Sequence, residues 1–96
     1  PSIDALARHG VVFSRASSTT SWTLPAHVSM LTGLDAETHG VVDDGLAIPA
    51  MIRTIAERAR AAGVETAGVY SGPYLQPVYG LGRGFRRPAM PARQLP

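Results

Sequence analysis

The stretch TLPAHVSMLTG, residues 23–33, places a hydroxyl two residues before a proline and an imidazole four residues after that hydroxyl. Pro25 suits the first position of a helix, because its fixed φ matches the first turn and its missing N–H is not needed there. Gly33 suits the left-handed residue that follows a helix. The sequence therefore predicts a helix from Pro25 to Thr32. Thr23 then lies just ahead of its positive end, where free N–H groups and the helix dipole favour an anion such as phosphate or sulfate.

Before this stretch, the sequence predicts one helix, one strand and a loop. Ser2 can cap a helix that runs through Arg8, with Gly10 as its stop. Residues 11–13 have the short apolar run of a buried strand. Residues 14–21 are rich in serine and threonine, which is typical of a loop that crosses the top of a sheet.

After this stretch, helix and strand patterns continue to alternate, as an α/β protein requires. Apolar residues recur at helical spacing over 50–62 and predict a helix that ends at Gly63. Residues 64–70 predict a parallel strand, and residues 34–49 a loop. The glycine-rich residues 80–84 fit neither the dinucleotide nor the nucleoside-triphosphate spacing and predict a turn.

The stretch 23–33 resembles the signature of the sulfatase-like family of the alkaline phosphatase superfamily. That signature runs nucleophile, any residue, proline, small residue, arginine or histidine, three residues, an aliphatic residue or methionine, threonine and glycine. Further blocks follow the family's order, so that the resemblance covers about residues 2–85: Ile3–Ala7 with Gly10–Phe13, His39–Val41, Ile55–Gly63 with Thr66–Gly68, and Gly80–Phe85. The resemblance implies an α/β fold, specifically a partial alkaline-phosphatase-like sandwich of parallel strands with flanking helices.

The residue at the nucleophile position decides which chemistry the resemblance implies. Sulfatases proper carry a cysteine there, sometimes a serine, which is converted to formylglycine, whereas this chain has Thr23 and no cysteine. A threonine followed by Pro25 and His27 is similar to the phosphodiesterase and pyrophosphatase members, which attack phosphorus with the threonine alkoxide. The resemblance thus implies a metal-dependent hydrolase of small-molecule sulfate, phosphate or phosphonate esters, with the phosphorus esters favoured. Thr23 and His27 are the implied catalytic residues.

The resemblance also implies a divalent metal ion, Ca, Zn, Mn or Mg, that contacts Thr23 and lowers the pKa of its hydroxyl. In the family, two aspartate ligands precede the segment that corresponds to residue 1, and the other ligands lie far beyond residue 96. We therefore expect residues 1–85 to be an N-terminal fragment of a catalytic domain, and residues 86–96 to be a disordered or non-family tail. The isolated chain is then expected to bind no metal and to be inactive. The alternative is a truncated α/β folding unit or interaction piece without catalysis.

Each candidate residue also has an ordinary structural interpretation. Thr23 could be an N-cap hydroxyl, and local sequence alone favours this interpretation. The other blocks that resemble the family favour the nucleophile instead. His27 could support the nucleophile or an oxyanion, or it could be a half-buried helix histidine that bonds a backbone carbonyl. His39 is similar to a family histidine that ties the loop after the nucleophile helix, so we expect a structural role. Asp43 and Asp44 lie downstream in a loop and are expected to form a solvated turn rather than a metal site.

The amino-acid composition excludes few further classes of function. Hydrophobic content of 45% and charged content of 17% are ordinary for a globular domain. The formal charge of +2 comes with nine arginines and no lysine, which indicates the codon bias of a GC-rich, bacterial-type genome rather than a nucleic-acid surface. No run of about 18 apolar residues predicts a membrane segment, and the absence of cysteine excludes disulfides. We expect neither a nucleic-acid nor a membrane partner, and a cytoplasmic or a secreted protein fits equally well.

Overall fold

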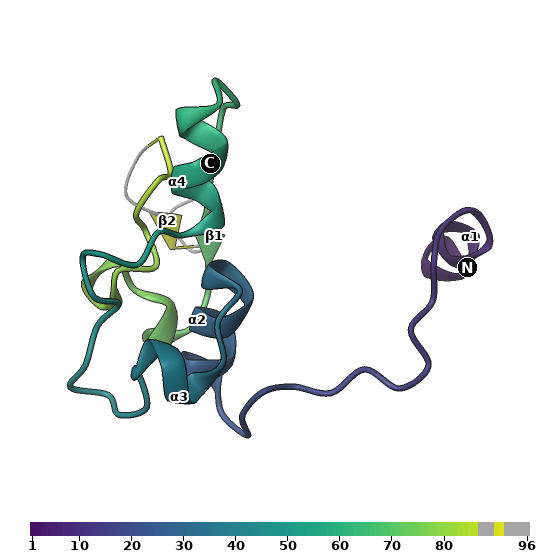
Figure 1. The fold of residues 1–96 in the computed structure, drawn as a ribbon. Helices are drawn as coiled ribbons and strands as arrows, with labels where there is room; N and C mark the ends of the chain where they lie inside the picture. The colour runs from purple at the N-terminus through teal and green to yellow at the C-terminus, as the bar shows by residue number, and fades with distance from the viewer. Residues whose placement is uncertain (87–89, 92–96) are drawn as a thin grey trace.

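The computed structural model describes residues 1–86 and 90–91 (Figure 1). The α-helices within these residues are α1 (Ser2–His9), α2 (Thr23–Thr32), α3 (Ala36–His39) and α4 (Ile55–Ala61). Two short 3₁₀ helices, η1 (Pro73–Leu75) and η2 (Pro77–Tyr79), follow the strand β1 (Val69–Tyr70). A second strand, β2 (Met90–Pro91), pairs with β1 in parallel, with Val69 opposite Met90 and Tyr70 opposite Pro91.

The predicted partial sandwich is not formed by the described residues, whose only sheet is the two-residue pair of β1 and β2. The buried strand expected at residues 11–13 is wrong. These residues are not in a strand, and Val11, Val12 and Phe13 are 79%, 67% and 78% exposed. A strand is stable only where neighbouring strands pair its backbone groups. The described residues supply no such neighbour to this segment.

The N-terminal arm, residues 1–16, extends away from the rest of the molecule (Figure 1). Its helix α1 agrees with the predicted helix to within a residue, but Pro1 rather than Ser2 stands at the N-cap position. Gly10 follows the helix in an extended conformation, not the left-handed one. None of the α1 residues is buried.

The core lies under α2. It consists of the buried side chains Leu24, Val28, Val41, Ile48 and Leu81. Partly buried side chains pack around it: Leu31, Ile52, Tyr74, Leu75 and Tyr79. Because Leu24 and Val28 are four residues apart, they lie on one face of α2. Burial of this face ties the position of α2 to the loops that carry the other core residues.

The α2 helix begins two residues earlier than predicted, at Thr23 rather than Pro25, and it ends as predicted. Pro25 therefore occupies the third helical position, and it is buried. Gly33 follows the helix with φ 74°, and its N–H donates to the Ser29 carbonyl oxygen at 2.9 Å. The prediction of a left-handed stop at this glycine is confirmed.

The predicted helix over 50–62 is shorter in the structure and starts at Ile55. Thr54 and Glu57 form a capping box: the Thr54 hydroxyl accepts from the Glu57 N–H at 3.2 Å, and the Glu57 carboxylate accepts from the Thr54 N–H at 3.0 Å. The hydrogen bond from the Thr54 N–H to the Glu57 carboxylate holds the pKa of Glu57 below its ordinary value, and the positive charge of Arg83 lowers it further.

The segment Arg83–Gly84 crosses the start of α4 and fastens it to the core. Thr54 donates its hydroxyl to the Arg83 carbonyl at 3.0 Å, and the Thr66 hydroxyl donates to the Gly84 carbonyl. Gly84 has φ +87°, and a Cβ atom there would stand 2.1 Å from the backbone nitrogen of Glu57. Only glycine allows this close approach.

Two further strand predictions are corrected. The expected strand over 64–70 is reduced to Val69 and Tyr70. Within the tail 86–96 that was expected to be disordered or non-family, Met90–Pro91 is a strand that pairs with β1. The rest of the predicted tail, 87–89 and 92–96, lies outside the described residues, so its disorder or family membership stays a prediction.

Candidate functional site

Thr23 is the first residue of α2 and is exposed to solvent. Trp22 is the N-cap residue and makes no side-chain capping bond. The interpretation of Thr23 as an N-cap is therefore wrong, because its backbone is already helical. The first N–H groups of a helix have no intrahelical partner, and Pro25 has no N–H to offer. Leu24 is fully buried, so only Trp22 and Thr23 carry free N–H groups on exposed residues, and the end of α2 presents the Thr23 hydroxyl beside these two at the positive end of the helix dipole.

His27 lies one turn further along α2 and is partly buried. Its Nδ1 lies 2.8 Å from the backbone carbonyl oxygen of Thr23. A carbonyl oxygen only accepts, so Nδ1 must be the donor. The ring also lines a cavity of about 180 Å³ whose other walls are mostly apolar: Leu31, Gly68, Val69, Tyr70, Leu75, Leu81 and Phe85. The histidine therefore makes the backbone contact of its structural interpretation, and its catalytic role stays a prediction.

A buried serine and histidine join α2 to the end of α3. Ser29 Oγ lies 3.0 Å from His39 Nε2, and His39 Nδ1 accepts from the Val41 N–H at 3.0 Å. Because Nδ1 is the acceptor, the proton of the neutral ring is on Nε2, which donates to Ser29. Nε2 therefore cannot take a proton from Ser29, and the pair is not a catalytic dyad. The expected structural role of His39 is confirmed by these contacts and by its burial, with 2% of the residue exposed.

Carboxylates around α3 have local roles. Asp35 caps α3: its Oδ1 accepts from the Thr38 N–H at 2.9 Å. This hydrogen bond lowers the pKa of Asp35. Asp43 and Asp44 are exposed and lie in a bend and a turn before Gly45, as predicted. The residues that follow α2 are thus ordered by caps and turns.

The residues present do not by themselves fit a divalent metal ion. Among residues 1–86 and 90–91, no group of three histidine, cysteine, aspartate or glutamate residues could hold one. The Thr23 hydroxyl offers a single oxygen at the end of α2. Divalent cations of the expected kinds take four to eight ligands. The predicted contact between a metal and Thr23 therefore stays a prediction.

Trp22 precedes the nucleophile position and packs edge-on against Tyr74. Their ring centroids are 5.2 Å apart and the planes meet at 86°. This geometry is a favourable aromatic arrangement. Trp22 is 36% exposed, so it lies at the edge of the core rather than within it.

Sequence reasoning missed the importance of Arg83. Its guanidinium donates to the backbone carbonyls of Ile48, Pro49 and Ile52, and lies 3.2 Å from the Glu57 carboxylate. These partners lie 26 to 35 residues away in sequence, so no local pattern could indicate them. The capping box was also missed, although its signature, threonine followed three residues later by glutamate, is visible at Thr54.

The family model for type I phosphodiesterase / nucleotide pyrophosphatase matches residues 1–73. The match covers most of the chain and includes Thr23 and His27, so the chain belongs to this family of phosphate-ester hydrolases within the alkaline phosphatase superfamily. It also supports the α/β class, although the described residues form little sheet. The match ends before the predicted family block at residues 80–85.

No curated protein and no solved structure matches the chain. The family match alone therefore carries the assignment, and it names phosphodiesterases rather than sulfatases. Among the described residues, no helix has the length and apolar character needed to cross a membrane.

Proposed function

We propose that the chain carries the nucleophile of a hydrolase of small-molecule phosphate or phosphonate esters, and that Thr23 is this nucleophile. One observation supports the proposal above the others: the Thr23 hydroxyl is exposed at the uncapped N-terminus of α2, inside the region that matches the family. Buried or capping hydroxyls, such as those of Ser29 and Thr54, have protein partners instead. Sulfate esters are the less favoured substrates, since the chain has no cysteine for formylglycine.

The proposed step is an in-line displacement at phosphorus. Thr23 Oγ forms a bond to phosphorus, the bond from phosphorus to the ester oxygen breaks, and the hydroxyl proton passes to a base or to solvent. In this proposal, the N–H groups of the exposed residues Trp22 and Thr23 donate to the non-bridging oxygens as negative charge develops on them. His27 serves as a positioning residue, because its bond to the Thr23 carbonyl holds the first turn that carries the hydroxyl.

A divalent cation, when bound, neutralises charge on phosphate oxygens and lowers the pKa of a hydroxyl that it contacts. In this proposal, Thr23 supplies one oxygen to the Ca, Zn, Mn or Mg ion. The remaining ligands come from residues outside the described part of the chain, which brings no three-ligand group together. Residues 1–96 alone are then inactive.

The proposal is tested with bis(4-nitrophenyl) phosphate as substrate and Mn²⁺ or Zn²⁺ in the buffer. Residues 1–96 are compared with a longer product of the same reading frame. We expect turnover by the longer product only. In that product, Thr23→Val should lower kcat by more than about a thousandfold, as removal of a nucleophile does, and Thr23→Ser should keep part of the rate. A Thr23→Val variant as active as the parent would refute the assignment.

The same assay distinguishes this hydrolase from the alternative, an inactive folding unit or interaction piece. The observation that favours this alternative is the missing ligand group among the described residues. A folded longer product without turnover on phosphate, phosphonate or sulfate esters would support it. The fold of each variant is checked by the fluorescence of Trp22, which stands beside Thr23 and packs on Tyr74.

A further inference from the structure

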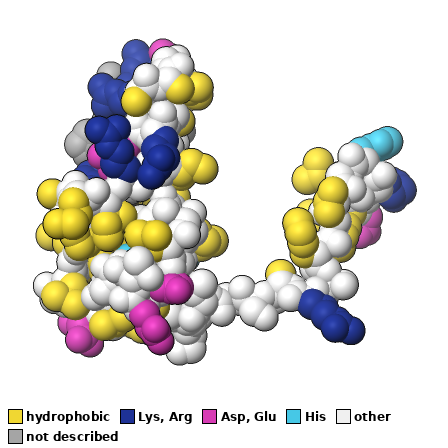
Figure 2. Space-filling model, in the orientation of Figure 1, with side chains coloured by type: hydrophobic (Ala, Val, Ile, Leu, Met, Phe, Trp, Pro, Cys, Tyr) yellow, Lys and Arg dark blue, Asp and Glu magenta, His cyan; other side chains and the backbone are white. Residues whose placement is uncertain are grey.

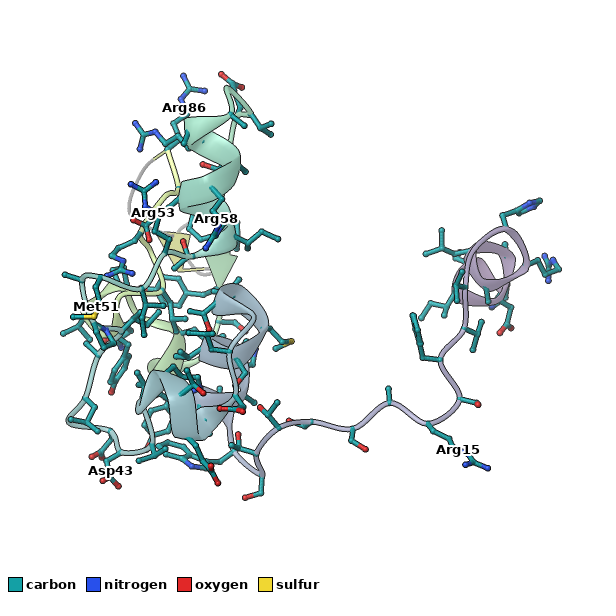
Figure 3. All side chains as sticks on the ribbon, in the orientation of Figure 1. Arg15, Asp43, Met51, Arg53, Arg58 and Arg86 are labelled. Atoms are coloured by element: carbon teal, nitrogen blue, oxygen red, sulfur yellow. The ribbon has the colours of Figure 1, made fainter. Side chains whose placement is uncertain are left out.

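Arginines that are well separated in sequence gather around α4. Arg53 precedes the helix, Arg58 and Arg60 lie on it, and Arg86 follows the segment that crosses its start. All four are exposed. Figure 2 shows several basic side chains at one end of the molecule, with acidic side chains among them, and Figure 3 labels Arg53, Arg58 and Arg86 around the helix. We call these four residues the arginine surface.

The arginine surface contains two adjoining hollows. One, of about 380 Å³, is lined by Arg53, Glu57, Arg60, Ala61 and Gly84. The other, of about 260 Å³, is lined by Arg60, Gly63, Val64, Glu65, Thr66 and Arg86. Arg60 lines both hollows and therefore stands between them. Each hollow has two arginines and one glutamate in its wall, and Arg58 lines neither of them.

The carboxylates nearby leave most of this positive charge unbalanced. Glu57 is already engaged by the Thr54 N–H and by Arg83. Glu65 lies 3.7 Å from Arg86, but both side chains are largely exposed, at 86% and 68%. Such exposed pairs are weak and are screened by salt. Within the described residues, Arg53, Arg58 and Arg60 form no salt bridge.

Acidic residues are concentrated elsewhere. Asp35, Glu37, Asp43 and Asp44 lie in or near α3. In Figure 2 several acidic side chains lie at the end of the molecule opposite the arginine surface, and others lie among the basic side chains. The formal charge of +2 thus conceals a separation of charge between the two ends. An anion that approaches the chain meets its positive potential at α4.

We propose that the arginine surface binds a free oligophosphate, an anion that carries two or more linked phosphate groups. One phosphate group lies in each hollow, and Arg60 contacts both. Guanidinium groups present paired N–H donors that match phosphate oxygens, and two neighbouring phosphates use the three arginines that line the hollows, Arg53, Arg60 and Arg86, better than a single phosphate does. This site lies on α4, and it does not use Thr23 or the end of α2.

The experiment is an NMR titration of ¹⁵N-labelled residues 1–96 at constant ionic strength. The probes are inorganic tripolyphosphate, orthophosphate and sulfate. With tripolyphosphate, we expect saturable shifts in the amide signals of residues 53–66 and 84–86, and no such shifts in α2. Orthophosphate and sulfate should bind at least about tenfold more weakly, because each fills one hollow only. Equal affinity for tripolyphosphate and orthophosphate would overturn the two-phosphate site.

The matched variants are Arg60→Gln and Arg15→Gln. Both remove one positive charge from an exposed side chain, but Arg15 lies on the N-terminal arm, far from α4 (Figure 3). We expect Arg60→Gln to raise the dissociation constant for tripolyphosphate about tenfold or more, and Arg15→Gln to change it less than about twofold. Equal weakening by the two variants would show that only net charge attracts the anion, and the proposal would be wrong.

Discussion

Gly84 offers a sharp test of how α4 is held, because it can be paired with a glycine of nearly the same backbone angle. Gly84 has φ +87° and Gly63 has φ +85°. A Cβ atom at Gly84 would stand 2.1 Å from the nitrogen of Glu57 and 2.5 Å from the carbonyl carbon of Ala56. A Cβ atom at Gly63 would meet nothing within 4 Å. Alanine at either position therefore pays the cost of a left-handed backbone, but only alanine at Gly84 also overlaps with other atoms.

The shared penalty is the left-handed backbone, about 1–2 kcal/mol for a residue with a side chain. At Gly84 the overlap with α4 adds to it, since carbon atoms pack favourably at about 3.5–4.0 Å. Relief of the overlap must move the backbone by more than about 1 Å, which breaks the hydroxyl contact of Thr54 with Arg83 at an added cost of about 1–3 kcal/mol. Gly84→Ala should then destabilise the chain by about 2–5 kcal/mol, a large part of a typical domain stability of about 5–15 kcal/mol.

The assay is urea unfolding followed by the fluorescence of Trp22, the only tryptophan of the chain, and by circular dichroism. We expect Gly63→Ala to lower the free energy of unfolding by about 1–2 kcal/mol with an unchanged m-value. Gly84→Ala should lower it by about 2–5 kcal/mol, more than Gly63→Ala does, or abolish the cooperative transition. Equal losses in the two variants would show that the segment at Gly84 does not press on the start of α4, and the reasoning would fail.

Two further predictions concern a buried contact and pH. Ser29→Ala removes the acceptor for His39 and should cost about 1–3 kcal/mol of unfolding free energy; in a double-mutant cycle with His39→Ala, a coupling energy near zero would contradict the contact. The capping bond to Thr54 lowers the folded-state pKa of Glu57, so its stabilisation is present above the unfolded pKa of about 4.3 and is lost as the pH falls through the lower folded value. In urea unfolding at a series of pH values, Glu57→Gln should weaken this acid dependence, and an unchanged dependence would argue against the capping box.

Features set by neighbouring residues were predicted best. The end of α2 follows from Gly33, and its start was missed by two residues because Pro25 is tolerated anywhere in the first turn. The turn at Asp43 and Asp44 follows from the local composition. At the site, the exposed position of Thr23 at the positive end of α2 agrees with what the sequence indicated.

Features that depend on distant partners were not predicted. Residues 11–13 have the composition of a strand, yet an apolar run cannot specify which strand will lie beside it. The anchoring of α4 by Arg83 joins residues that no periodicity connects. The orientation of His27, whose Nδ1 donates to Thr23, was one of two interpretations left open, since sequence gives a residue's spacing and not the direction of its ring.

The N-terminal arm has a thermodynamic consequence of its own. The α1 helix has eight residues, and its apolar side chains Ile3 and Leu6 are 83% and 75% exposed. A solitary helix shorter than about 12–15 residues is only marginally stable in water. Burial of the apolar side of α1 against another surface must therefore stabilise the helix, and helix formation must in turn favour that burial. A surface that binds this arm must offset the conformational entropy that α1 loses when its helix forms. The association is therefore weaker per unit of buried area and readily reversible.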